Sequence, residues 1–309
     1  MILSCGEALI DMLPRTTAAG EEAFAPYAGG ALFNTAIAVG RLGAPSGFFS
    51  GLSRDLFGEQ LQGVLAASNV DTSPSHVSDR PTTLAWVRLK DGHATYTFYD
   101  ENTALRMLSP ADLPALGPEV AALVFGCISL VGEPCGSAYE ALQAREAPAR
   151  VTLLDPNIRA GFVAFMGNEG AYRARLDRMA ARADIVKASD EDLRWLLGPG
   201  DPEDHARALL DRGPRLVLVT LGGEGALAVS PRGALRVPAP RVTVADTVGA
   251  GDTFSAGVLV ALHRAGLLSK ADVASLTEDA IRDAVTLGAR AAAVTVSRPG
   301  ADPPWAHEL

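Results

Sequence analysis

The chain has 309 residues and a formal net charge of −9, from 27 basic and 36 acidic residues. An acidic chain without a basic stripe is a poor candidate for binding nucleic acid or an anionic membrane surface. The three cysteines form no C-x-x-C pair and no apolar run reaches about 18 residues, so no disulfide framework, zinc site or membrane helix is expected. The first residues lack the basic segment of a signal peptide, which favours the cytoplasm.

Short apolar runs alternate with helical patterns along the chain, which predicts an α/β fold whose central, mostly parallel sheet has helices on both faces. A first strand is expected at residues 2–5 and a helix at 31–42, where apolar residues recur at helical spacing. Further strands, each followed by a helical stretch, are expected at residues 121–125, 151–154, 185–186 and 216–220. The clearest late helices are expected at residues 252–265 and 278–293. We assign residues 1–309 to a single domain.

One segment departs from this alternation of strands and helices. Between residues 82 and 99, apolar and polar side chains alternate around Asp91-Gly92, a dipeptide typical of hairpin turns. Such alternation leaves one face of the hairpin in water. We therefore expect a small antiparallel sheet that projects from the main domain, built from segments near 12–27 and 82–105. The alternative is an edge hairpin of the main sheet.

The residues from Asp246 to Gly257 combine a glycine-rich turn with the start of a helix. The small residues Gly249, Ala250 and Gly251 let the backbone approach a ligand closely and point several N–H groups in one direction. The helix N-terminus adds unpaired N–H groups and the positive end of its dipole. This pattern predicts a cradle for developing negative charge, with Asp252 at its mouth as a base for a hydroxyl. The alternative is that Asp252 only caps the helix.

Signatures of other nucleotide-dependent enzymes are absent from the sequence. It contains no G-x-x-x-x-G-K-[ST] motif, which argues against a P-loop NTPase. It contains neither the catalytic loop of protein kinases nor a G-x-G-x-x-G after an expected strand. Phosphoryl transfer supported by backbone N–H groups is therefore the chemistry that the cradle indicates.

The segment around Asp252 resembles the C-terminal signature of the ribokinase-like sugar kinases, the PfkB family. A second segment, from Gly29 to Ala36, resembles the N-terminal signature of the same family, in which a Gly-Gly turn opens a helix with Asn one turn inside. The two segments occur in the order that the family has. The resemblance implies a ribokinase-like three-layer sandwich, with a central mostly parallel sheet and a small β-sheet lid over the sugar.

The resemblance also implies roles for the matching positions. Asp252 is implied as the catalytic base, and Gly249, Ala250 and Gly251 as the anion hole. Sugar contacts are implied for Asp11, Gly29, Gly30 and Asn34, and Arg159 could pair with phosphate or substrate oxygens. ATP contacts are implied for Ser189, Thr220, Gly222, Gly223 and Gly225. The alternatives are a surface Asp11, a structural Arg159 and an ordinary turn between strands at residues 220–225.

One stretch departs from the pattern of the family. Many relatives carry Asn-x-x-Glu near the metal and the phosphates, where this chain has the residues from Ser189 to Asp192. The resemblance implies ATP and Mg²⁺, with Asp192 near the metal through a water molecule, but its shorter side chain changes that geometry. The alternative is an acidic helix start favoured by the helix dipole. A requirement for a monovalent cation such as K⁺ is left open.

The opening from Gly6 to Asp11 and the residues 98–104 look most like bacterial fructokinases. The resemblance implies an ATP-dependent phosphotransferase that acts on a primary hydroxyl of a sugar, with D-fructose as the expected substrate. A 2-keto-3-deoxygluconate kinase, which shares the Asp-x-Asn-x-Arg pattern at residues 155–159, is the second candidate. A sugar- or nucleotide-binding regulator on the same fold is the non-enzyme alternative. The expected partners are the sugar, ATP and a second copy of the chain bound through the lid.

Overall fold

The computed structural model describes residues 1–90 and 93–309. Its main sheet has nine strands, which pair in parallel except at one edge, where the last two pairings are antiparallel. In spatial order the strands are β6 (Val70–Asp71), β4 (Ser46–Phe49), β1 (Ile2–Cys5), β10 (Ala122–Gly126), β11 (Val151–Asp155), β12 (Ile185–Ser189), β13 (Leu216–Thr220), β14 (Ala226–Ser230) and β15 (Gly233–Val237).

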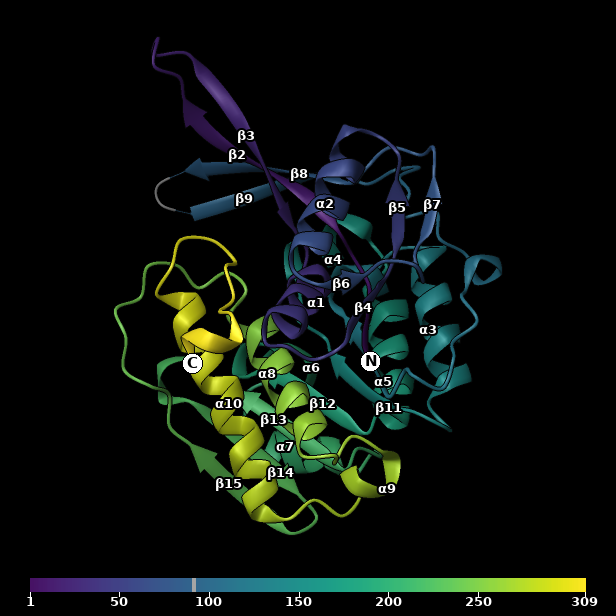
Figure 1. The fold of residues 1–309 in the computed structure, drawn as a ribbon, viewed down its shortest axis with the longest axis vertical. Coiled ribbons are helices and arrows are strands. Elements are labelled where there is room, and N and C mark those ends of the chain that lie inside the picture. Colours follow the sequence, from purple (N-terminus) through teal and green to yellow (C-terminus); the bar gives the residue numbers. More distant parts are fainter. Residues whose placement is uncertain (91–92) are drawn as a thin grey trace.

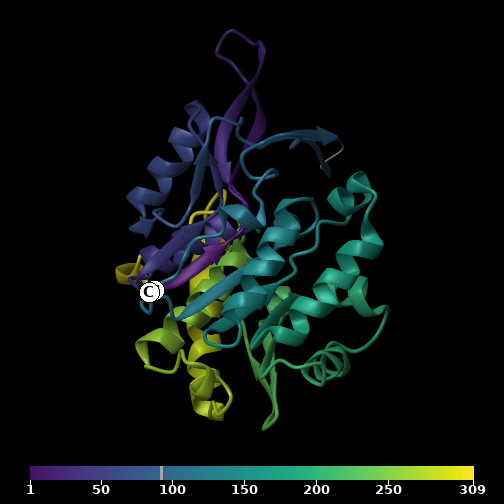
Figure 2. The same cartoon turned by 90° about the vertical axis from the view of Figure 1, so that its right-hand side faces the viewer.

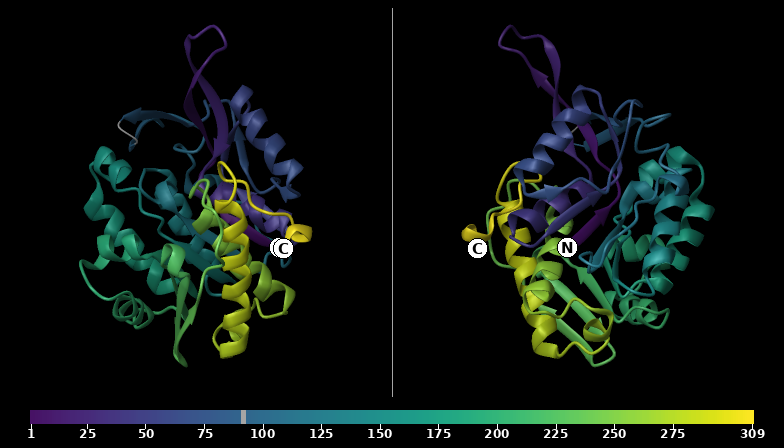
Figure 3. Two further views of the ribbon diagram at one scale, coloured as in Figure 1. Left: turned by 90° about the vertical axis from the view of Figure 1, so that its left-hand side faces the viewer. Right: turned by 45° about the vertical axis from the view of Figure 1, so that its right-hand side comes forward.

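Helices cover both faces of this sheet, as Figures 1 and 2 show. On one face, α8 (Ala250–Arg264) packs against α1 (Ala31–Arg41) and α10 (Glu278–Val296). On the other, α3 (Cys135–Glu146) packs against α5 (Glu169–Arg182), and the two views of Figure 3 separate these layers. The remaining helices are α2 (Leu56–Ala67), α4 (Ala160–Met166), α6 (Asp190–Leu197), α7 (Pro202–Leu210) and α9 (Lys270–Val273), with short 3-10 turns at η1 (Pro110–Asp112), η2 (Cys127–Leu130), η3 (Gly222–Glu224) and η4 (Ala306–Glu308). The predicted fold class is confirmed.

The central strands are buried along their whole length because helices cover both faces of the sheet. Every residue of β1, β4, β10 and β11 is buried. This burial explains why these strands appear in the sequence as short continuous apolar runs and not as alternating ones. Within the described part of the chain, no helix is both long enough and apolar enough to cross a membrane.

The prediction of a helix after residues 216–220 is wrong. After β13 the chain turns back and forms β14 and β15, each antiparallel to its neighbour. Gly225 permits this turn, because its φ is +103° and an added Cβ would lie 2.1 Å from the carbonyl oxygen of Val237. The residues of β14 are all buried, so the apolar run at this point of the sequence is a buried strand of the sheet and not a helix.

The hairpin at residues 82–99 belongs to a second sheet and not to the edge of the main one. This sheet has the order β3 (Glu22–Gly29), β2 (Leu9–Thr16), β8 (Leu84–Lys90) and β9 (His93–Tyr99). β2 pairs antiparallel with β3 and parallel with β8, and β8 pairs antiparallel with β9. The sheet projects from the main body at the top of Figure 1. The predicted Asp91-Gly92 turn lies outside the described residues. A third, two-stranded sheet joins β5 (Gly51–Ser53) to β7 (His76–Ser78).

Candidate active site

The candidate residues lie where the parallel strands of the main sheet end. β11, β12 and β13 end at Asp155, Ser189 and Thr220, and all three strands run in one direction. In open α/β sheets this edge is the usual place for a ligand. β2 of the projecting sheet begins at Leu9, shortly after β1 ends at Cys5, so the projecting sheet is joined to the same edge.

Asp252 is held in the first turn of α8 by the glycine turn before it. Gly249 is the N-cap residue and has φ +78°, a left-handed conformation that favours glycine. The Asp252 side chain is buried, and its two oxygens accept hydrogen bonds from two amides. Nδ2 of Asn34 lies 2.9 Å from Oδ2, and Nδ2 of Asn157 lies 3.2 Å from Oδ1. Both hydrogen bonds described for this carboxylate come from amides of distant segments and not from the backbone of α8, which disfavours the capping alternative for Asp252.

The surroundings of Asp252 raise the pKa of its carboxyl group to near neutral pH. Burial raises the pKa of Asp252 to about 7, although the hydrogen bond from Asn34 favours the ionised form and acts to lower the pKa. The negative charge of Asp155 raises this pKa further, whereas the positive charges of Lys187 and Arg159 lower it. A carboxyl group whose pKa lies near the working pH is well suited to take up and release a proton.

A lysine lies behind the glycine turn. Lys187 and Asp155 are both buried, and Lys187 Nζ is 2.9 Å from Asp155 Oδ2. A Cβ added to Gly251 would lie 2.6 Å from Nζ, so a larger residue would require the ammonium group or the first turn of α8 to move. Burial acts to lower the pKa of Lys187, but the nearby carboxylates of Asp155, Asp192 and Asp252 together outweigh it and the pKa is raised. A positive charge therefore lies behind the backbone of Gly251, where it reinforces the helix dipole.

The residues expected to contact the sugar gather beside this centre. Asp11 lies against Gly29, because an added Cβ there would be 2.5 Å from Asp11 Oδ2. Gly30 has φ +117°, and the N–H of Ala31 donates to Oε1 of the buried Glu7 at 2.8 Å. This contact fixes the Gly-Gly turn that opens α1 and so places Asn34 at Asp252.

Arg159 and Arg106 differ in what they contact. Arg159 is exposed. Burial raises the pKa of Asp11 to about 6, although the positive charge of Arg159 acts to lower it. Arg106 is tied to the protein instead: Nη1 lies 2.9 Å from Oδ2 of Asp100, and Nε donates to the carbonyl of Glu133 at 2.5 Å. Arg159 is thus the arginine that can reach a substrate without giving up an ion pair.

The residues expected to contact ATP lie at the ends of β12 and β13. The turn at residues 220–225 joins two strands, and Cβ atoms added to Gly222 or Gly223 would meet open space. The turn is therefore accessible from solvent. Ser189 caps α6, where its hydroxyl accepts the N–H of Asp192 at 3.0 Å.

Asp192 already has backbone partners for both of its carboxylate oxygens. The N–H of Ser189 donates to Oδ2 at 2.9 Å, and the N–H of Ile158 donates to Oδ1 at 2.7 Å. Among the described residues, no group of three or more His, Cys, Asp or Glu side chains could hold a metal. Oδ2 also accepts the hydroxyl of Ser189 at 2.7 Å, so the described contacts of Asp192 leave a free lone pair on Oδ1 alone.

Three residues of this centre were not predicted from the sequence: Asp155, Asn157 and Lys187. Lys187 carried a usable signal, because a lysine within a short apolar strand is buried and such a lysine needs a partner. Asp155 and Asn157 stand in the quoted stretch that ends with Arg159, but the sequence does not show that they reach Lys187 and Asp252.

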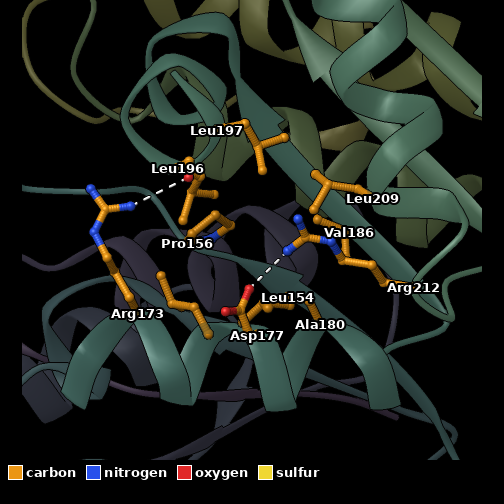
Figure 4. Close-up of a pocket in the computed structure, with 11 residues that line it drawn as sticks. Leu154, Pro156, Arg173, Asp177, Ala180, Val186, Leu196, Leu197, Leu209 and Arg212 are labelled. Carbon is orange, nitrogen blue, oxygen red and sulfur yellow. Dashed lines mark hydrogen bonds and ion pairs between the residues drawn. The ribbon is translucent and has the colours of Figure 1, made fainter. Parts of the chain in front are cut away.

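A hollow of about 240 Å³ lies away from this centre, on the face of the sheet that carries α5 (Figure 4). Its floor is apolar, and an Arg212–Asp177 ion pair of 2.8 Å crosses its rim. None of the residues expected to bind sugar or ATP lines it. The lining residues are Leu154, Pro156, Arg173, Leu176, Asp177, Ala180, Val186, Leu196, Leu197, Leu209 and Arg212.

Comparison with known proteins identifies the family. The model of the pfkB family carbohydrate kinases matches residues 1–308. A fructokinase from Rhizobium leguminosarum bv. trifolii is 56% identical over 283 residues, which cover 92% of this chain and 86% of the relative. A fructokinase from Xylella fastidiosa with bound ATP superposes with a TM-score of 0.85 at 28% identity, over 97% of this chain and 93% of that one. A fructokinase from Vibrio cholerae O395 bound to fructose, ADP and calcium has a TM-score of 0.82 at 29% identity, over 97% and 94% of the two chains. The chain therefore belongs to the pfkB family of carbohydrate kinases.

Proposed function

We propose that this protein is an ATP-dependent fructokinase, a phosphotransferase that moves the γ-phosphate of ATP to a primary hydroxyl of D-fructose. The observation that carries the proposal is the buried Asp252, held by two amides at the N-terminus of α8. The similarity to fructokinases over most of the chain supports the same reaction. The retained carboxyl group and intact glycine turn favour an enzyme over a sugar-binding regulator.

The proposed reaction divides the chemistry between Asp252 and the glycine turn. Asp252 accepts the proton of the sugar hydroxyl as the hydroxyl oxygen forms a bond to the γ-phosphorus, and the bond from phosphorus to ADP breaks. The N–H groups at Gly249, Ala250 and Gly251 stabilise the charge that spreads over the phosphoryl oxygens. The ammonium group of Lys187 adds a fixed positive charge behind them.

ATP binding at the ends of β12 and β13 would use the accessible turn at residues 220–225 and the hydroxyls of Ser189 and Thr220. A divalent cation such as Mg²⁺, when bound, neutralises charge on the β- and γ-phosphates. Mg²⁺ usually keeps several waters and takes one or two carboxylates. Asp192 would use Oδ1 for a contact through such a water, because Oδ1 accepts one hydrogen bond whereas Oδ2 accepts two from Ser189.

The charges of the site favour a neutral sugar over an acid sugar. Asp11 and Asn34 suit hydroxyl groups, and Asp11 would repel a carboxylate. Of the two arginines that could offset this repulsion, Arg106 is engaged by Asp100 and Glu133. Only Arg159 remains for a substrate anion, which disfavours the 2-keto-3-deoxygluconate alternative.

We expect release of ADP with D-fructose, ATP and Mg²⁺, and a kcat/KM for D-fructose at least about 10²-fold above the other substrates, because buried polar groups strongly reject molecules that lack their partner hydroxyls. The panel contains 2-keto-3-deoxygluconate, ribose, glucose, adenosine and inosine, each tested with and without K⁺. A preference for 2-keto-3-deoxygluconate would replace the proposal and make Arg159 a carboxylate ligand. Saturable sugar binding without turnover would favour the regulator.

The two faces of the projecting sheet carry different side chains, because side chains alternate along its strands: one face carries Asp11 and the other carries two exposed aromatic rings. Asp11 is paired with Ala85 on the first face, and the neighbouring pair of Met12 and Trp86 lies on the second. On this second face Trp86 packs edge to face with Phe24 at 4.5 Å and with Tyr99 at 6.4 Å, although Phe24 and Tyr99 are 43% and 62% exposed. We propose that the sheet is a lid over the sugar and that this aromatic face binds a second copy.

We expect the mass of a dimer in light scattering at micromolar concentration. The double variant Phe24→Ser, Tyr99→Ser should be a monomer, because it removes the two exposed rings from the aromatic face. As a control, Leu56→Ser replaces a side chain that is 75% exposed and lies at the start of α2. A monomeric wild-type protein, or a double variant that remains dimeric, would contradict this arrangement.

A further inference from the structure

Asn157 lies 95 positions before Asp252 in the chain but contacts its carboxylate directly. It follows β11 by two residues, and Nδ2 donates to Oδ1 of Asp252 at 3.2 Å. Asn34 donates to the other oxygen, Oδ2, at 2.9 Å. The two amides therefore approach the carboxylate from different segments of the chain, and each occupies one oxygen.

The loop that carries Asn157 is fixed on both sides of this residue. The carbonyl of Pro156 accepts the N–H of Cys127 at 3.2 Å and the hydroxyl of Tyr172 at 3.3 Å. The N–H of Ile158 donates to Asp192 at 2.7 Å. Asn157 itself has φ +39°, a left-handed conformation that asparagine tolerates better than most residues. The backbone is thus held in a shape that presents the amide to Asp252.

We propose that Asn157 is a positioning residue for the base: together with Asn34 it holds the Asp252 carboxylate in one orientation and leaves a lone pair on each oxygen for the sugar hydroxyl. This inference rests on the proposed kinase function. An amide carries no charge, so it can orient the carboxylate and favour its ionised form without neutralising it.

The charged groups around Asp252 shift its pKa in opposite directions, so a hydrogen bond to the carboxylate can change its protonation state. Asp155 at the end of β11 opposes ionisation of Asp252, whereas Lys187 of β12 and Arg159 of the following loop favour it. Cys127 of η2 also interacts electrostatically with Asp252. Burial favours the neutral form of Asp252, and the hydrogen bond from Asn34 acts against it. The amide of Asn157, 3.2 Å from the other oxygen, favours the ionised form in the same way.

The test replaces Asn157 by Gly and by Asp. Glycine accepts the left-handed backbone and removes only the amide, whereas aspartate keeps the shape but places a second carboxylate against Asp252. We expect Asn157→Gly to lower kcat about tenfold with little change in KM for ATP. The acid limb of kcat/KM should move up by about one pH unit, because a hydrogen bond to the ionised form is lost. Asn157→Asp should move that limb further.

The control is Asn69→Gly, because Asn69 also has a left-handed backbone, with φ +60°, and is exposed. We expect its acid limb and kcat to match those of the wild-type protein. An acid limb that stays in place in both Asn157 variants would overturn the inference, whatever happens to kcat. If Asn157→Gly does not fold, Asn157→Asp decides the question alone.

A second measurement separates this inference from the proposed function. The ¹³C signal of the Asp252 carboxyl group, assigned by its loss in Asp252→Asn, follows the protonation of this group without turnover. An upward shift of its midpoint in Asn157→Gly supports the inference even if no sugar is phosphorylated. An unchanged midpoint overturns it even in a fully active kinase.

Discussion

Asp252→Asn is expected to lower kcat by about 10²-fold or more, because an amide of nearly the same shape cannot take the proton from the sugar hydroxyl. KM for ATP should change little, since the phosphate cradle at residues 249–251 stays in place. Steady-state kinetics with D-fructose and direct nucleotide binding measure the two quantities. Near wild-type turnover would remove Asp252 as the base.

The same variant should also change how the stability of the fold depends on pH. Burial raises the pKa of Asp252 to about 7 in the folded protein, well above the value of about 4 of a free carboxyl group. Between these values the unfolded chain ionises Asp252 while the folded protein still holds its proton. The contribution of Asp252 to the free energy of unfolding is therefore full below pH 4 and falls by about 1.4 kcal/mol per unit as pH rises to 7.

Asp252→Asn removes this titration, so its free energy of unfolding should rise relative to the wild-type protein between pH 4 and pH 7. Denaturant titrations at several pH values measure the difference. The variant should also lose a constant amount of unfolding free energy at every pH, because one amide donor would face the NH₂ group of the new side chain. A difference that does not vary with pH would contradict the raised pKa.

The parts of the fold that the sequence predicted are those governed by local pattern. The runs at residues 2–5 and 216–220 became β1 and β13 with the same bounds, because strands covered on both faces carry mostly apolar side chains. The strand that follows β13 was missed, since a short apolar run cannot by itself distinguish a buried strand from a buried helix. The turn at Gly225 decided between them.

The parts of the site that the sequence did not predict are contacts between distant segments. Asp252 could be chosen because its glycine turn and helix start are adjacent in sequence. Its contact with Asn157, and the pair of Lys187 with Asp155, arise only because β11 and β12 are neighbours in the sheet and α8 packs across their ends. Strand order follows from the packing of the whole domain, which no local pattern of residues shows.

Gly251→Ala is expected to lower kcat by about 10²-fold while the protein stays folded. The new Cβ would lie 2.6 Å from Nζ of Lys187, which the buried contact with Asp155 holds in place. Either Lys187 leaves Asp155 or the first turn of α8 moves away, and both displace the charges and N–H groups that stabilise the phosphoryl group. In a helix, alanine is otherwise preferred to glycine by up to about 1 kcal/mol. Steady-state kinetics and thermal unfolding measure the two effects.

Gly63→Ala provides the matched control, because Gly63 lies in α2 and an added Cβ there meets nothing within 4 Å. It should keep full activity and gain slightly in stability. A second comparison tests whether the clash with Lys187 is the cause. Lys187→Met should by itself be destabilising, because it leaves Asp155 buried without its partner. In the double variant the two losses should not add, since the ammonium group that the added methyl group would strike is no longer there. Full additivity, or a fully active Gly251→Ala, would show that the close contact between Gly251 and Lys187 does not govern the anion hole.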